Sequence, residues 1–344
     1  MCSNLRRVAI LLAFVVLGLP GENNAAKNGK PGVADIGGAK AVLWSDPADI
    51  ASRNLLYGSG GEGRQPRGPF TFIEEDTEGS NPKLDIRDID GVKWKVKLGA
   101  EARPEVAASR LVWAAGYFTT DDYFLEELRV QDLPGRLHRG QELVGPDGTL
   151  HNVRLKRPMK DQEKLGTWHW ASNPFQGTRE FNGLRVLMAL MNNWDLKDSN
   201  NAVYQAKNHD EAGERPRIYL VSDLGATFGT TGYIRSLEAS RGNLDSYKQS
   251  KFISNLNSDF VDFGAPGRPT LLETVNLPVF LHRLDLRSIG RRIPREDAKW
   301  IGQLLGRLSQ EQIRDAFRAA GYSSVETNEF ARVVESRIAE LNAL

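Results

Sequence analysis

Two short segments in the second half of the chain carry the residue types that phosphoryl transfer requires. The first reads Asn-Trp-Asp195-Leu-Lys197-Asp-Ser-Asn200, and the second ends an apolar run as Tyr-Leu-Val-Ser-Asp223-Leu-Gly. A carboxylate beside an attacking hydroxyl can take its proton. Carboxylate and amide oxygens are the ligands that Mg²⁺ prefers. The order and spacing of these residues therefore predict transfer of a phosphoryl group from a nucleoside triphosphate.

A cation for the phosphates is available in the first half of the chain. Residues 92–98 alternate apolar side chains with lysines, as a strand with one buried face does, and Lys97 is the last of these lysines. The next segment, 104–115, has apolar residues at helical spacing and carries Glu105 in its first turn. We expect this helix to pack on the sheet, so that Glu105 pairs with Lys97 and holds it toward the phosphates.

The two later segments then supply the remaining roles. Asp195 is the predicted base for the acceptor hydroxyl, and Lys197 is predicted to neutralise charge on the transferred group. Asn200 and Asp223 are the predicted ligands of Mg²⁺. The lysine–glutamate pair is the predicted binding site for ATP.

These motifs resemble those of the protein-kinase-like superfamily. The stretch from Asp195 to Asn200 resembles the Asp-x-Lys-x-x-Asn catalytic loop of protein kinases, and Asp223-Leu-Gly resembles their Asp-Phe-Gly metal motif. The strand lysine and helix glutamate are similar to the kinase ion pair. The helix also resembles that of HipA-type kinases, and the segment from Val221 to Gly229 resembles phosphatidylinositol-kinase-like enzymes. The resemblance implies ATP and Mg²⁺ as cofactors.

The residue patterns and the resemblance together imply an α+β class, with a bilobal protein-kinase-like fold. We predict a small β-rich N-lobe with one helix at residues 42–158, and a mainly helical C-lobe at residues 159–344. Strands are predicted at 69–74, 84–88, 92–98 and 123–130, with a hairpin formed by 141–144 and 150–156. Helices are predicted at 178–191, 296–308, 310–320 and 325–341, and a long loop at 226–269.

The start of the chain predicts export. Residues 1–26 have the order of a secretory signal peptide: a basic start, an apolar run from Val8 to Leu19, and small residues up to Ala26. The apolar run is short, since a bilayer span needs about 20 residues. Cleavage is the favoured interpretation, and an uncleaved N-terminal anchor is the alternative. We predict an extracytoplasmic domain, periplasmic or secreted, preceded by a flexible tether at residues 27–41.

Composition excludes several other classes. Lysine and arginine total 45 against 44 aspartate and glutamate, so the balance indicates neither a nucleic-acid-binding protein nor one bound to an anionic membrane surface. The single cysteine, Cys2, lies in the predicted signal peptide, which excludes disulfides and Cys-ligated zinc from the mature chain. The five histidines show no metal-ligand spacing.

The predicted function is that of an extracytoplasmic atypical kinase. It would transfer the γ-phosphoryl of ATP to a hydroxyl of a protein, glycan or lipid headgroup. One alternative is a secreted pseudokinase or binding module, which would hold a partner through the region of Trp168 and Trp170 or through the 226–269 loop. Another is a nucleotidyl transferase on the same fold. The complete set of catalytic and metal residues favours an enzyme, because a scaffold has no need of all of them.

Overall fold

The computed structural model describes residues 32–36, 39–77, 81–208, 215–230, 240–264 and 288–344. The predicted signal peptide at residues 1–26 lies outside the described residues. Among the described residues, no helix combines the length and the apolar character needed to cross a bilayer.

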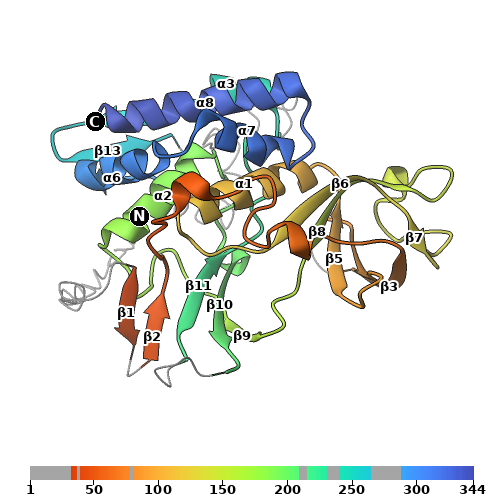
Figure 1. Ribbon diagram of the computed structural model, residues 1–344. Helices are drawn as coiled ribbons and strands as arrows, with labels where there is room; N and C mark the ends of the chain where they lie inside the picture. The colour runs from red at the N-terminus through yellow and green to blue at the C-terminus, as the bar shows by residue number, and fades with distance from the viewer. Residues whose placement is uncertain (1–31, 37–38, 78–80, 209–214, 231–239, 265–287) are drawn as a thin grey trace, which may run out of the picture.

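A six-stranded sheet forms the core of the N-lobe (Figure 1). In sheet order its strands are β6 (Asp122–Leu128), β8 (Leu150–Lys156), β5 (Lys93–Leu98), β4 (Lys83–Arg87), β3 (Phe70–Asp76) and β7 (Val130–Gln131). The predicted antiparallel meander of β3, β4 and β5 is confirmed. Strands β6 and β7 follow one another along the chain and occupy opposite edges of the sheet, so the sheet must curve strongly.

The hairpin predicted from 141–144 and 150–156 is wrong in its first half. Residues Gln141–Leu143 form a short 3-10 helix, and a bridge between Val144 and Leu150 is the only pairing found there in the described chain. Both edges of β8 are instead occupied by β5 and β6. The 141–144 segment therefore has no free edge of β8 along which to extend.

Helix α1 (Ala102–Ala114) is the predicted N-lobe helix, and it is buried on nearly every side. It contacts β6 and β8 of the N-lobe sheet and also α7 of the C-lobe (Figure 1). Its apolar residues, including Val106, Leu111 and Val112, belong to the same hydrophobic core as the C-terminal helices. The position of this helix is thus fixed by packing from both lobes.

A second sheet lies below α1 and α2 in the view of Figure 1 and joins the start of the chain to its middle. Its strands are β1 (Val33–Ile36), β2 (Ala39–Val42), β11 (Arg217–Val221), β10 (Asn201–Ala206) and β9 (Gln162–Gly166). The predicted tether at 27–41 is therefore wrong from Val33 onward. Glycine-rich composition concealed two short strands, because β2 gains its partner β11 from a distant part of the sequence.

In the part of the C-lobe that the structure describes lie the remaining α-helices and a small third sheet. The helices are α2 (Arg179–Leu190), α3 (Leu244–Gln249), α6 (Arg295–Leu305), α7 (Gln310–Arg318) and α8 (Ser324–Asn342). The strands are β12 (Ile253–Leu256), β13 (Phe260–Phe263) and β14 (Ile293–Pro294). The four predicted C-lobe helices are confirmed, and α7 and α8 begin with capping boxes. The α+β class, with a β-rich N-lobe and a helical C-lobe, is confirmed as well.

The long loop predicted at 226–269 is wrong in part, because it contains α3, β12 and β13. These elements are too short to show a clear period in the sequence. They are held by aromatic residues that enter the main core, among them Tyr247, Phe252 and Phe263.

Candidate functional site

Lys97, at the end of β5, is the centre of a buried ion cluster. Its side chain is only 4% exposed, and its Nζ lies 2.8 Å from Glu105 Oε2, 3.2 Å from Glu101 Oε2 and 2.5 Å from Asp223 Oδ1. The alternation of β5 predicted a polar face for all its lysines, but α1 covers this end of the sheet. Burial without a partner would be costly for an ammonium group, and the three carboxylates offset that cost.

The electrostatics of the cluster keep both members of the predicted pair charged. Burial lowers the pKa of Lys97, but the attraction of Glu105, Asp223 and Glu101 outweighs it and raises the pKa above its usual value. Burial likewise raises the pKa of Glu105, but Arg154 and Lys97 outweigh it and hold the pKa below its usual range. The lysine therefore stays a cation and the glutamate an anion at neutral pH.

Arg154 is a second buried cation, and sequence reasoning missed it. It lies on β8 directly opposite Lys97 in the antiparallel pairing of β5 and β8. Like charges in such positions repel one another. The carboxylate of Glu105 offsets this repulsion because it bridges the two cations. Its Oε1 lies 3.0 Å from Arg154 Nη2, and its Oε2 faces Lys97. No local sequence signal reveals Arg154, because its position depends on which strands pair.

Glu101 is the other missed carboxylate. It precedes the first turn of α1, and besides Lys97 it accepts a hydrogen bond from Asn81 Nδ2 at 2.8 Å. Its Oε1 lies 2.8 Å from Arg241 Nε. A Cβ at Gly225 would lie 2.6 Å from Glu101 Cβ, so the glycine of the Asp-Leu-Gly motif allows α1 to approach this closely. The one signal in the sequence that could have indicated Glu101 is its position four residues after Lys97, the residue with which it pairs.

The predicted catalytic loop folds into a compact turn. Asp195 Oδ1 lies 2.8 Å from Lys197 Nζ, and Asn200 Nδ2 donates to the backbone oxygen of Asp195 at 2.7 Å. Asn193 Oδ1 accepts from the backbone N–H of Asp195 at 3.0 Å. The side chains of Asp195 and Lys197 are 23% and 50% exposed, so both are accessible to a ligand.

Strand pairing brings the second motif beside this loop. Asn201 of β10 pairs with Val221 of β11, and the backbone oxygen of Asn200 accepts from Ser222 N at 3.0 Å and Ser222 Oγ at 2.9 Å. Asp223 follows with a φ of +55°, a left-handed conformation that aspartate tolerates better than most residues. Its side chain is 43% exposed while one oxygen contacts Lys97.

The structure thus places all the predicted site residues in one connected arrangement. Lys97 contacts Glu105 and Asp223 directly, Ser222 joins Asp223 to the Asn200 turn, and that turn holds Asp195 and Lys197. The roles assigned to these residues stay predictions.

The oxygen donors fit Mg²⁺ that arrives with phosphates. The half-exposed carboxylate of Asp223 and the side-chain amide of Asn200 are hard ligands of the kind Mg²⁺ prefers. Among the described residues there is no cluster of three or more His, Cys, Asp or Glu side chains placed to hold a metal by themselves. Mg²⁺ commonly binds through one or two carboxylates plus substrate phosphates, and this arrangement matches that mode.

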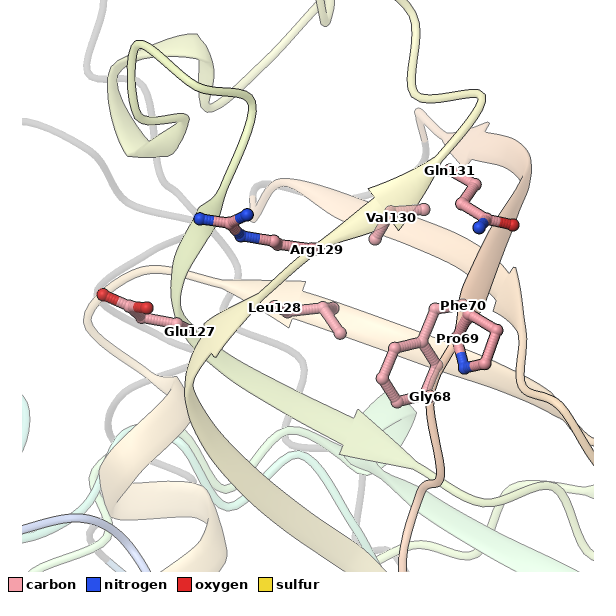
Figure 2. A pocket seen from close by; sticks show the side chains of 8 residues that line it. All are labelled: Gly68, Pro69, Phe70, Glu127, Leu128, Arg129, Val130 and Gln131. Atoms are coloured by element: carbon pink, nitrogen blue, oxygen red, sulfur yellow. The ribbon is translucent and has the colours of Figure 1, made fainter.

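Two other features offer no comparable chemistry. A hollow of about 380 Å³ lies where β6 passes into β7, lined by Gly68, Pro69, Phe70, Glu127, Leu128, Arg129, Val130 and Gln131 (Figure 2). Its walls are mainly apolar and none of the predicted site residues lines it. Trp168 and Trp170 are 3% and 6% exposed and pack edge-to-face in the core. Packing is the use that the sequence favoured for this tryptophan pair, over stacking on a sugar or base, and the structure agrees with it.

No protein-family model matches the chain, and no curated protein matches it. Solved structures similar to it include the Helicobacter pylori proinflammatory kinase CtkA, with 11% identity over 79% of this chain and 96% of that chain, at a TM-score of 0.42. They also include the Golgi casein kinase, with 9% identity over 87% of this chain and 75% of that chain, at a TM-score of 0.38. Both similar structures are described as kinases. Because both TM-scores are below 0.5, we infer the chemistry of the site from its side-chain geometry alone.

Proposed function

We propose that this chain is an atypical kinase that transfers the γ-phosphoryl of ATP to a hydroxyl group. One observation supports the proposal above all others. A buried lysine on a strand contacts both a helix glutamate, at 2.8 Å, and the aspartate of the metal motif, at 2.5 Å. Phosphoryl transfer relies on positioned charge more than on covalent chemistry, and this contact joins the predicted phosphate-binding cation to the predicted metal ligand.

The residues of the site divide the reaction between them. Lys97 would bind phosphate oxygens, while Asp223 and Asn200 would hold Mg²⁺, which supplies charge neutralisation on the phosphates when bound. Asp195 would accept the proton of the acceptor hydroxyl while the oxygen of that hydroxyl forms a bond to the γ-phosphorus. The bond from that phosphorus to the oxygen bridging the β-phosphate breaks, and ADP leaves. Lys197, beside Asp195, would offset negative charge on the transferred group.

The acceptor and the compartment are part of the same proposal. Residues 1–26 have the order of a signal peptide, which supports an extracytoplasmic kinase acting on a protein, glycan or lipid headgroup. Fractionation of a tagged full-length chain tests the location. Recovery of the protein from the cytoplasm with its N-terminus intact would contradict it.

A thermal-shift titration of the purified full-length protein tests nucleotide use. We expect Mg²⁺ with ATP to raise the Tm, since a ligand at 100 times its Kd stabilises a protein by about 2.7 kcal/mol. ATP with EDTA should give a much smaller shift, and Mg²⁺ alone little or none. Identical Tm values in all four samples, including protein alone, would exclude the kinase proposal. A nucleotide shift without transfer to a broad set of acceptors would instead favour the pseudokinase alternative.

A further inference from the structure

Arg241 packs against Trp194, the residue before the predicted base, although the two are distant in the sequence. Its backbone is fixed on both sides. Ser240 and Thr230 exchange two backbone hydrogen bonds, at 2.7 and 3.2 Å, and Gly242 N donates to Thr227 O at 2.9 Å. These bonds attach the arginine to the segment that directly follows the Asp-Leu-Gly motif. Arg241 is therefore held in place relative to the metal motif.

The side chain of Arg241 bridges the two halves of the site. Its guanidinium carbon lies 5.0 Å from the ring centroid of Trp194, which immediately precedes Asp195. Its Nε lies 2.8 Å from Oε1 of Glu101, whose other oxygen contacts Lys97. The arginine thus contacts both the tryptophan that precedes the predicted base and the glutamate that pairs with the predicted phosphate-binding lysine.

The outer end of this guanidinium has no partner in the part of the chain that the structure describes. Among the described residues, no hydrogen bond or ion pair is found for its two terminal nitrogens, and the side chain is 30% exposed. Stacking on the Trp194 ring and the ion pair at Nε hold the guanidinium plane in position. Both contacts leave the N–H donors of the two terminal nitrogens available. Such a group is prepared for an anion with two acceptor oxygens.

The charges of the other side chains in the site indicate which anion Arg241 would bind. The site holds the carboxylates of Asp195, Asp223, Glu101 and Glu105, and three of them already share Lys97. The γ-phosphoryl group carries negative charge on three oxygens during transfer and needs further cations. We propose that Arg241 is a further catalytic residue, whose terminal nitrogens bind oxygens of the γ-phosphoryl group.

This inference depends on the proposed kinase function and adds a residue to it. Arg241 would only donate hydrogen bonds to the non-bridging oxygens of the γ-phosphoryl group, whose bonds to phosphorus stay intact. An arginine in this role contributes to the rate by stabilising charge in the transition state. A lysine would retain the charge but lose the two-nitrogen fork.

The experiment compares ATP and ADP binding, because only ATP carries the group that Arg241 contacts. In the full-length protein with Mg²⁺, Arg241→Ala should weaken ATP binding by roughly 10- to 100-fold, the worth of a hydrogen bond to a charged group. Its ADP affinity should equal that of wild type. Arg241→Lys should recover only part of the loss. Arg179→Ala is the matched control, since Arg179 also stacks on a tryptophan, Trp300, at 4.8 Å, away from this site.

Each other outcome has a distinct meaning. Equal weakening of ATP and ADP would overturn the proposal, since Arg241 would then act only through Glu101 and Lys97. Unchanged affinity for both nucleotides would also overturn it, while leaving the kinase proposal intact. If wild type binds neither nucleotide, the kinase proposal fails and this inference fails with it. Melting curves of both Arg241 variants establish that they are folded.

Discussion

The two halves of the candidate site differ sharply in their exposure to solvent. In the half built on β5, β8 and α1, the side chains of Lys97, Arg154 and Glu105 are 4%, 6% and 1% exposed. In the half built on the loops after α2 and β11, the side chains of Asp195 and Asp223 are 23% and 43% exposed. The first half is assembled as part of the hydrophobic core, and the second is presented to a ligand.

Under the proposed kinase function, this difference predicts how binding and chemistry would be divided between the two halves. A buried ion cluster cannot rearrange without leaving a charge unpaired, so the lysine is held in one position before any nucleotide arrives. The open half keeps carboxylates within reach of metal, phosphate and acceptor. Mutations in the buried half should therefore affect stability as well as binding, and mutations in the open half should affect chemistry and metal binding with little change in stability.

The largest expected effect is in the open half. Asp195→Asn should lower phosphoryl transfer by roughly 10²- to 10⁴-fold, the usual contribution of a positioned base, while Tm and nucleotide affinity stay near wild type. Asp223→Asn is the comparison, since loss of a charged ligand should weaken Mg²⁺-dependent ATP binding as well as transfer. Single-turnover rates and nucleotide titrations measure the two properties. If the two variants behave identically, the separate roles of base and metal ligand are wrong.

Glu105→Gln should have the largest effect in the buried half. Removing one partner of a buried ion cluster costs about 3–5 kcal/mol, and this change leaves Lys97 and Arg154 without the anion between them. Because the pKa of Glu105 in the folded state is below its ordinary value of 4.5, its stabilisation is present above about pH 4.5 and is lost as the pH falls further. Urea unfolding of wild type and variant should give curves that converge in acid. A constant difference from pH 7 to pH 3 would argue against this electrostatic origin.

Two lysines on the same strand provide a matched pair. Lys97→Met should weaken ATP binding by at least about tenfold and also lower the Tm, because three carboxylates lose their cation. Lys95→Met should do neither, since the Lys95 side chain is 55% exposed and its Nζ contacts Asp76 at 3.6 Å and Asp85 at 3.5 Å, away from the cluster around Lys97. Isothermal titration and thermal melting test both variants. Equal effects would show that Lys97 has no special role with phosphates.

The smallest effect is expected at the joint between the two motifs. Ser222→Ala removes the hydrogen bond from Oγ to the backbone oxygen of Asn200 but keeps the parallel bond from the Ser222 N–H. We expect a loss of about 1 kcal/mol or less in stability, with transfer reduced only a few-fold. Chemical unfolding together with kcat measurement checks this. A loss as large as that of Asp223→Asn would mean that Ser222 itself takes part in binding.

Local patterns in the sequence determined a large part of this protein. The alternation of β5, the apolar stripes of α2 and α6 to α8, and two capping boxes depend on neighbours within a few residues, so they could be predicted directly. The spacing from Asp195 to Asn200 is likewise local, and the turn that it forms needs no distant partner. Such features are set by the chain's own backbone and side-chain chemistry.

Tertiary structure alone decided what lies beside these features. Arg154 faces Lys97 because β8 pairs with β5, and β1 and β2 become strands because β11 offers an edge. Arg241 stands beside Trp194 through backbone bonds to the segment after Asp223. The energy of each of these contacts comes from residues far apart in the sequence. A local period cannot reveal which distant edge or charge will be present. Arg154 and Glu101 therefore became visible only in the folded chain, although the pair of Lys97 and Glu105 was predicted from the sequence.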